Sequence, residues 1–455
     1  MLSNRRLGNR RLGSRRLGKL GPRKLGRRKL GPRKPGVALT AAAAAGVLAL
    51  LPALPAAAAT AVAPAPDAIS GGSGAATAAS ELARSQEQWV LGMLDVAPAW
   101  SVTQGAHVTV AVIDSGVNKD VSDLSGRVIS GPDYTRLSTQ PSNRYWGQHG
   151  TWMASIIAGD GGTDGFQGIA PDAKILSIRV IPDTTDPGYH TYDSEPEQQI
   201  QNELASGIMT AVKDHAQVIS MSIGYSAPSG VVRAALQYAY AHGAVLVASS
   251  GNSGQNDEKR DHDWSPVSFP ADYPGVLSVA AVNDGGTTAS FSSSNLSVQV
   301  AAPGNNVPAQ GRDGQYYTVD GTSPACALVA GVAALIKSAY PNISPALVVQ
   351  AITSTAKEPG PGGYNVHTGF GIVDANAALT KAGQLLKQHH AGSQVSLTGH
   401  FGGGTAAVPA APVAPRGTGR LLLFAVLAAI SLAAAAGGLT AAYRARAPRY
   451  RPWHG

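Results

Sequence analysis

Short apolar runs rich in β-branched residues alternate with longer segments of helical periodicity through the centre of the chain. The runs predict buried strands, and they span residues 107–113, 174–180, 218–224, 245–249 and 276–282. Helical periodicity covers residues 197–216 and 231–242. This alternation predicts an α/β fold, with a mostly parallel sheet and helices on both of its faces. Functional side chains are then expected at the carboxyl ends of the strands.

A later run of small apolar residues, reaching Lys337, predicts a helix that is packed on both sides. We expect Thr322 or Ser323 to cap its start, and Pro324 to lie in the first turn, where a missing N–H costs nothing. The Ser323 hydroxyl would then lie at the positive end of a buried helix, which stabilises nearby negative charge.

The N-terminal pattern predicts export. Residues 1–36 form a basic, glycine-punctuated n-region of low complexity, residues 37–59 are apolar, and residues 60–84 are a linker of small residues. A basic segment, an apolar segment and then small residues form a signal-peptide pattern, with cleavage expected near Ala57–Ala59. The general secretory route is favoured over a twin-arginine signal. An uncleaved anchor is the alternative, because the apolar run is long enough to span a bilayer.

The C-terminal pattern predicts a membrane anchor. A linker rich in Pro, Gly and Ala covers residues 391–419, and residues 421–442 contain no charge. Such a helix would be roughly 33 Å long, enough to cross a bilayer core of about 30 Å. The tail of residues 443–455 holds four arginines and no acid, so the positive-inside rule places it in the cytoplasm and the main domain, residues 85–390, outside.

Charge is divided unevenly along the chain, whose formal net charge is +8. The two basic ends carry eighteen Lys or Arg and no acid, which leaves eighteen basic residues against all 28 acidic ones in the rest. An acidic body argues against nucleic-acid binding. The single cysteine, Cys326, excludes an intramolecular disulfide and is expected to be a small buried residue.

Four polar residues lie at positions where the predicted fold would place functional side chains, at or after strand ends and at helix starts. Asp114 ends the first strand, His149 opens a helix, Ser323 opens another, and Asn252 follows a strand in a glycine-rich turn. The order Asp, His, Ser is one known arrangement of a nucleophile, a base and an orienting acid. An Asn252 amide could donate a hydrogen bond to a developing oxyanion. The alternative is an ordinary α/β domain with a capping serine and a surface histidine.

Together these four stretches resemble the subtilase family of serine proteases, and further matching segments extend the resemblance over residues 85–390. It implies a subtilisin-like fold, a protein or peptide substrate, and catalytic roles for Asp114, His149 and Ser323. We expect no cofactor and no metal site: some subtilases bind calcium, but this sequence shows no dense loop of oxygen ligands. The resemblance also implies that two strand segments line the substrate site: Ser222, Ile223 and Gly224, with Ser249, Ser250 and Gly251. The chain departs from the family pattern at Pro324, Ala327 and Leu328.

The layout of a signal, a protease domain, a linker, one span and a basic tail looks like the mycosins, the membrane-anchored subtilases of actinobacterial type VII secretion systems. This implies a single-pass cell-membrane protein that contacts lipid through its C-terminal helix. It further implies processing of secretion substrates and association with the secretion complex. Two alternatives stay open: a structural component of that complex whose proteolysis is secondary or lost, and a general cell-surface protease.

Overall fold

The computed structural model describes residues 85–162, 165–255, 264–360 and 362–390, together with residues 426–429, 431–434, 437 and 440 near the C-terminal end. The segments predicted at 1–36, 37–59, 60–84, 391–419 and 443–455 lie outside the described residues. Of the predicted span at 421–442, the ten described residues are helical and the others lie outside that set. The contacts divide the chain into two units, residues 1–382 and 383–455, and each is described by itself.

The strands of the central sheet all run in the same direction. Neighbours pair in the order β2-β3-β1-β4-β5-β6-β7, and every pair is parallel. The bounds are β1 (Thr109–Asp114), β2 (Val128–Asp133), β3 (Lys174–Arg179), β4 (Val218–Met221), β5 (Val245–Ser249), β6 (Val276–Val282) and β7 (Val300–Pro303). Two further strands, β8 (Val307–Gln310) and β9 (Tyr316–Val319), form a separate antiparallel sheet. The predicted α/β class with a mostly parallel sheet is confirmed.

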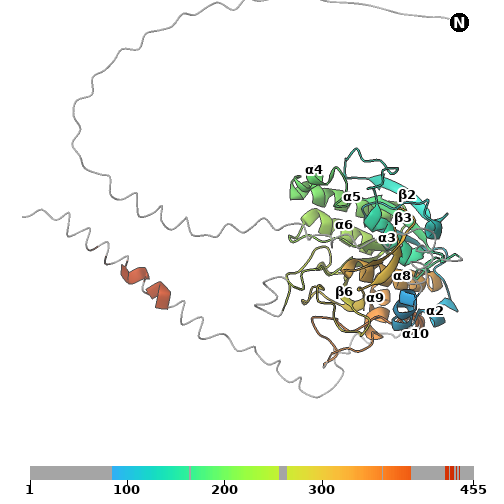
Figure 1. Cartoon of the computed structure of the whole chain (residues 1–455). Coiled ribbons are helices and arrows are strands. Elements are labelled where there is room, and N and C mark those ends of the chain that lie inside the picture. Colours follow the sequence, from blue (N-terminus) through green and yellow to red (C-terminus); the bar gives the residue numbers. More distant parts are fainter. Residues whose placement is uncertain are drawn as a thin grey trace, which may run out of the picture. The chain divides into compact units, whose positions relative to one another are not determined.

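Helices cover both faces of this sheet (Figure 1). The longer ones are α3 (Gln148–Ala158), α5 (Glu197–Lys213), α6 (Gly230–Ala241), α8 (Thr322–Ala339), α9 (Pro345–Ser354) and α10 (Ala375–His390). Shorter helical segments are residues 85–93, α2 (Val96–Trp100), η1 (Ser122–Leu124) and α4 (Tyr189–Asp193).

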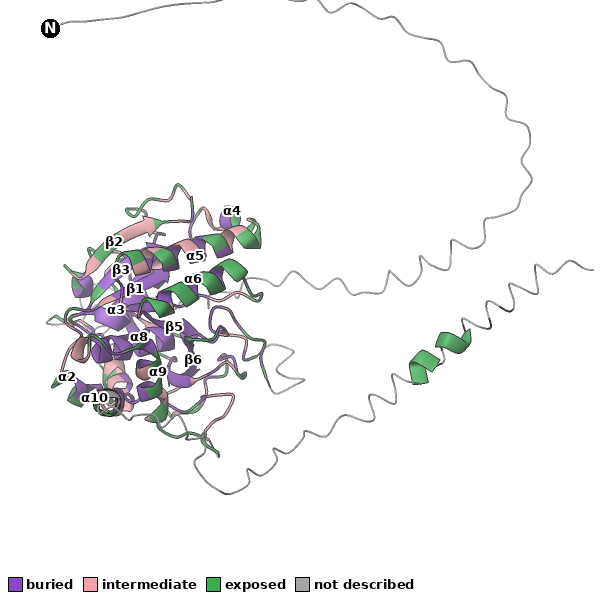
Figure 2. Cartoon of the chain, turned by 180° about the vertical axis from the view of Figure 1, so that it is seen from behind, coloured by how far each residue is buried: buried purple, intermediate pink, exposed green. Residues whose placement is uncertain are grey.

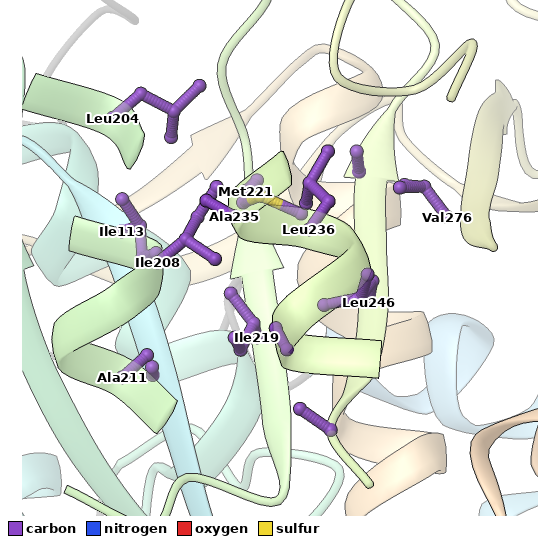
Figure 3. Close-up of a cluster of buried hydrophobic side chains, with 14 of the residues drawn as sticks. Ile113, Leu204, Ile208, Ala211, Ile219, Met221, Ala235, Leu236, Leu246 and Val276 are labelled. Atoms are coloured by element: carbon purple, nitrogen blue, oxygen red, sulfur yellow. The ribbon is translucent and has the colours of Figure 1, made fainter. Parts of the chain in front are cut away.

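Side-chain alternation along β4 shows which helices lie on which face. Ile219 and Met221 belong to the buried cluster that α5 and α6 form with the sheet (Figure 3). Ser220, between them, points to the other face, where its Oγ lies 3.8 Å from the Cys326 Sγ of α8. Successive strand residues face opposite sides, so α5 and α6 cover one face and α8 covers the other. The outward sides of α5 and α6 are exposed (Figure 2).

Helix α8 is the central helix of the core. Among the described residues it alone is long and apolar enough to span a membrane by length and composition, yet 83% of its apolar window is buried inside the protein. It runs unbroken through Pro324, Ala327 and Leu328, so the helix accommodates all three departures from the family pattern. Pro324 is its third residue, where no N–H is needed.

The expected cap of α8 was wrong. The residue at the N-cap is Gly321, with φ 143°, and no side chain caps the helix there. Thr322 and Ser323 are instead the first two helical residues. A cap leaves its hydroxyl turned toward the helix, whereas a residue inside the first turn can direct its side chain toward other segments. This placement frees the hydroxyls of Thr322 and Ser323 for contacts with the ends of β4 and β5.

Candidate active site

Asp114 is the last residue of β1 and is only 1% exposed. Its Oδ1 accepts a hydrogen bond from the Ser115 backbone N–H (2.7 Å) and lies 2.7 Å from Nδ1 of His149. A carboxylate at the end of a buried strand is held rigidly, because neighbouring strands pair with β1 on both sides. The aspartate can therefore fix the orientation of the imidazole.

His149 is the second residue of α3, and its side chain is almost fully buried. Burial lowers the pKa of the imidazole, but the charge of Asp114, its hydrogen bond and the charge of Asp183 outweigh burial and raise the pKa of His149 above its usual value. The Asp114 carboxylate accepts the proton on Nδ1, so the neutral ring leaves Nε2 free to accept another proton. This is the tautomer that a general base requires.

Ser323 lies at the start of α8 and is partly exposed. Its Oγ donates to the Ser222 carbonyl (3.3 Å), and Ser222 Oγ donates in return to the Ser323 carbonyl (3.1 Å). Within the described residues no hydrogen bond joins Ser323 to His149. Catalytic hydrogen bonds are often loose before substrate binds, and a turn about the serine Cα–Cβ bond changes where its hydroxyl points.

The orientation of the Asn252 amide is set by Thr322. Asn252 Oδ1 accepts from both the backbone N–H and the hydroxyl of Thr322, each at 2.9 Å. Because the oxygen meets these donors, the Nδ2 group must face the other way, and a Cβ built on Gly321 would lie 3.4 Å from it. The amide N–H groups therefore lie beside the turn that leads into α8.

The two predicted substrate segments come to the same edge of the sheet. Residues 222–224 follow β4, and residues 249–251 end β5 and enter the next turn. Ser222 contacts Ser323, and the Gly251 N–H donates to the Thr322 hydroxyl (3.2 Å). Gly251 has φ 103°, a conformation that favours glycine. Both segments thus touch the first turn of α8.

Sequence reasoning missed two residues of this arrangement. The sequence pattern predicts only a possible capping role for Thr322, although its place just before Ser323 is a signal that could identify it as part of the site. Asp183, whose carboxylate accepts the backbone N–H groups of Gln148 and His149, was not considered at all. Nothing in its own loop sequence indicates that contact, which only the fold creates.

We also searched the part of the chain that the structure describes for a metal site and for a reactive cysteine. No group of three or more His, Cys, Asp or Glu side chains there could hold a metal ion. Cys326 is fully buried, and burial raises the pKa of its thiol to about 11, so it stays protonated and unreactive at neutral pH.

The sequence and the fold are similar to those of known proteases. A model of the subtilase family matches residues 105–371. Fervidolysin from Fervidobacterium pennivorans is 33% identical over 65% of this chain, which spans 44% of that relative's length. Mycosin-1 from Mycobacterium tuberculosis is 36% identical over 64% of this chain and 73% of its own length. The crystal structure of MycP1 from the ESX-1 type VII secretion system is 34% identical, with a TM-score of 0.54, over 64% of this chain and 85% of that one.

Proposed function

The chain belongs to the subtilase family of serine endopeptidases, and we propose that Asp114, His149 and Ser323 are its catalytic triad. The observation that carries the proposal is the 2.7 Å contact between Asp114 Oδ1 and His149 Nδ1, made by two buried side chains at the carboxyl edge of the sheet. Ser323 enters the same region from the first turn of α8.

The reaction follows from these positions. The Ser323 hydroxyl turns away from the Ser222 carbonyl and attacks the carbonyl carbon of a peptide bond, while His149 Nε2 accepts its proton. The imidazolium, stabilised by Asp114, gives that proton to the leaving amine, and an ester to Ser323 remains. Water then attacks the ester by the same proton route and restores the free serine.

The negative charge that develops on the substrate carbonyl oxygen must be stabilised by hydrogen-bond donors. Ser323 is the second residue of α8, so its N–H has no carbonyl partner within the helix. The Asn252 amide, held by Thr322, is the second donor that we propose. The positive end of α8 adds to the same field, and one such donor is typically worth about 3–4 kcal/mol of transition-state stabilisation.

Substrate backbone would bind along the segments that follow β4 and β5. Ser222, Ile223 and Gly224 on one side, with Ser249, Ser250 and Gly251 on the other, flank the start of α8. Extended edges of this kind bind peptides by adding a strand, through main-chain hydrogen bonds.

Covalent labelling tests the triad in the full chain. A fluorophosphonate should modify Ser323, as peptide mapping by mass spectrometry would show. His149→Ala should remain unlabelled, because the serine then lacks a base. Ser101→Ala, an exposed serine whose Oγ binds Pro98, is the matched control and should label as the parent does. A label on a different serine would remove Ser323 from the role of nucleophile.

We further propose a single-pass membrane protein with residues 85–390 outside the cytoplasm, which processes substrates of a type VII secretion complex. The predicted span at 421–442 supports the anchor, and the likeness to mycosins, including MycP1 of such a system, supports the partner. A second candidate, a complex component with secondary or lost proteolysis, is favoured by the departures at Pro324, Ala327 and Leu328.

Two measurements separate these candidates. Purification of the full chain from detergent-solubilised membranes should bring secretion components with it, whereas a general surface protease would come alone. Mapping of protein N-termini in culture fluid, with the parent and with Ser323→Ala, should reveal processed substrates that disappear in the variant. Co-purification with unchanged N-termini would favour the structural component.

A further inference from the structure

The first backbone N–H groups of α3 donate hydrogen bonds to a side chain from a distant loop. The N-cap residue is Gly147, with φ 78°, so no side chain can cap the helix from that position. Asp183 supplies the acceptors from the loop that follows β3. Its Oδ2 accepts from the Gln148 N–H (2.8 Å), and its Oδ1 accepts from the His149 N–H (2.9 Å). A helix N-terminus favours a carboxylate at this position.

This carboxylate is a buried negative charge. Asp183 is 7% exposed. Burial, together with the charge of Asp114, raises the pKa of Asp183 above its usual value, although the hydrogen bonds from the two backbone N–H groups and the charge of His149 act to lower it. Both carboxylate oxygens accept hydrogen bonds, an arrangement that suits the ionised form. In that form Asp183 and Asp114 act on the same imidazole from different elements, and each raises the pKa of His149.

Few other charged groups surround this pair. Arg312, from the turn between β8 and β9, donates to the Pro141 carbonyl (3.0 Å) and to that of Asn143. Burial lowers the pKa of Arg312, whereas the charges of Asp183 and Asp313 raise it. Asp313 is exposed and accepts from the Tyr317 hydroxyl. On α3 itself, the neutral Trp152 ring meets the His149 ring edge-on, with centroids 6.3 Å apart.

We propose that Asp183 is a positioning residue for the hydrolysis reaction: its carboxylate holds the backbone of His149 at the start of α3 and adds a second buried negative charge beside the imidazole. The inference rests on the proposed function of His149 as the base. Asp114 fixes the ring through Nδ1, and Asp183 fixes the backbone from which the ring extends. The imidazolium that forms during reaction is then balanced by two carboxylates, one at the end of β1 and one in the loop after β3.

A charge-neutral substitution tests this role. Asp183→Asn keeps the size and one carbonyl oxygen but removes the charge, so the midpoint of the acid limb in the pH profile of kcat/KM should fall by roughly half a pH unit or more. Asp183→Glu, which keeps the charge, should return the midpoint toward the parent value. Asp313→Asn removes a charge beside Arg312 but no hydrogen bond to the backbone of α3, because Asp313 accepts from the Gln315 N–H and the Tyr317 hydroxyl, and it should leave the midpoint unchanged. If Asp183→Asn does not fold, Asp183→Ser replaces it as the neutral variant, because a serine hydroxyl can still accept from the helix.

The pKa of His149 can also be measured in the same variants without enzyme turnover. In the Ser323→Ala background, the imidazole of His149 is titrated by NMR and assigned by its loss in His149→Ala. A lower His149 pKa in the neutral variants supports the proposal even where activity is weak. An unchanged pKa, with only the melting temperature lowered, would reduce Asp183 to a structural cap and overturn the inference. Failure of Ser323 labelling in the parent protein would instead overturn the proposed function.

Discussion

At the scale of single residues, the hydrogen bonds between Thr322 and Asn252 fix the orientation of the Asn252 amide. Thr322 uses its N–H and its hydroxyl to hold Asn252 Oδ1, so the amide N–H groups are oriented before any substrate arrives. Preorganised donors stabilise a developing charge without further rearrangement. The amide should therefore matter for turnover and be dispensable for the reactivity of the serine.

Asn252→Ala is expected to lower kcat by roughly 10²–10³-fold while leaving fluorophosphonate labelling of Ser323 largely intact. Thr322→Val keeps the backbone N–H to Asn252 but loses the hydroxyl, so its effect should be in the same direction and smaller. Steady-state kinetics and labelling rates measure the two effects separately. Loss of labelling in Asn252→Ala would mean that the side chain supports the nucleophile itself.

The pH dependence follows from the surroundings of His149. The base must be neutral to accept the serine proton, and the pKa of His149 is raised above the ordinary value of about 6.5 by Asp114 and Asp183. The rate should therefore rise with pH, with the midpoint of kcat/KM above about 6.5. A profile that is flat from about pH 5 to 8 would contradict a histidine base.

What the sequence could reveal about the site depended on the range of the contacts. Asp114, His149, Asn252 and Ser323 lie at or just after strand ends and at helix starts, so the roles that we propose for them could be predicted from local pattern and order. Asp183 and Thr322 act through contacts with segments 34 to 70 residues away. The position of Thr322 beside Ser323 marks it as part of the site, but no local pattern indicates that its partner is Asn252 or that Asp183 contacts the start of α3.

At the scale of elements, the close approach of α3 to β1 places His149 beside Asp114. Gly150, the residue after His149, makes that approach possible, since a Cβ there would lie 2.1 Å from the Gly116 carbonyl oxygen. Backbone at such a distance cannot rotate away as a side chain would. The helix or the turn after β1 would have to move.

Gly150→Ala should therefore destabilise the protein by about 2–3 kcal/mol and abolish hydrolysis, although alanine is the better helix former. Gly230→Ala is the matched control: Gly230 is the first residue of α6, and a Cβ there meets nothing within 4 Å. It should stabilise by up to about 1 kcal/mol. Urea unfolding compares both variants with the parent, and equal stabilities for the two would refute the packing argument.

Element prediction succeeded where the pattern was strong. The buried strands β3, β5 and β6 each lie within a predicted apolar run. Strand β1 extends one residue beyond its run, to Asp114, and β4 ends at Met221, three residues before its run does. Strand β2 was missed because its residues are half-exposed or exposed and form no apolar run. Strand β7 was missed as well, because its four buried residues form too short a run to predict a strand.

At the scale of the whole molecule, the basic ends and the acidic body should lie on opposite sides of the membrane if the predicted span at 421–442 is correct. Protease added to intact spheroplasts should then remove residues 85–390 and spare a tag on Gly455. Digestion of the tag, with the main domain protected, would reverse the orientation.

The charge partition can be tested separately. A soluble fragment of residues 85–390 should focus at an acidic pH, although the whole sequence has a pI near 9.5. All 28 acidic residues lie between the two basic ends. Isoelectric focusing of the fragment measures this directly, and a pI well above neutrality would show that the partition is wrong.

We propose that the hydroxyl of Ser323 is the nucleophile in peptide hydrolysis. The decisive experiment compares the purified full chain with Ser323→Ala on a fluorogenic peptide library. Circular dichroism and the melting temperature would verify that both are folded alike. The variant should keep its fold and lose nearly all cleavage, by roughly 10³-fold or more, because the attacking oxygen is gone. Cleavage by the Ser323→Ala protein at the parent rate would contradict the proposal.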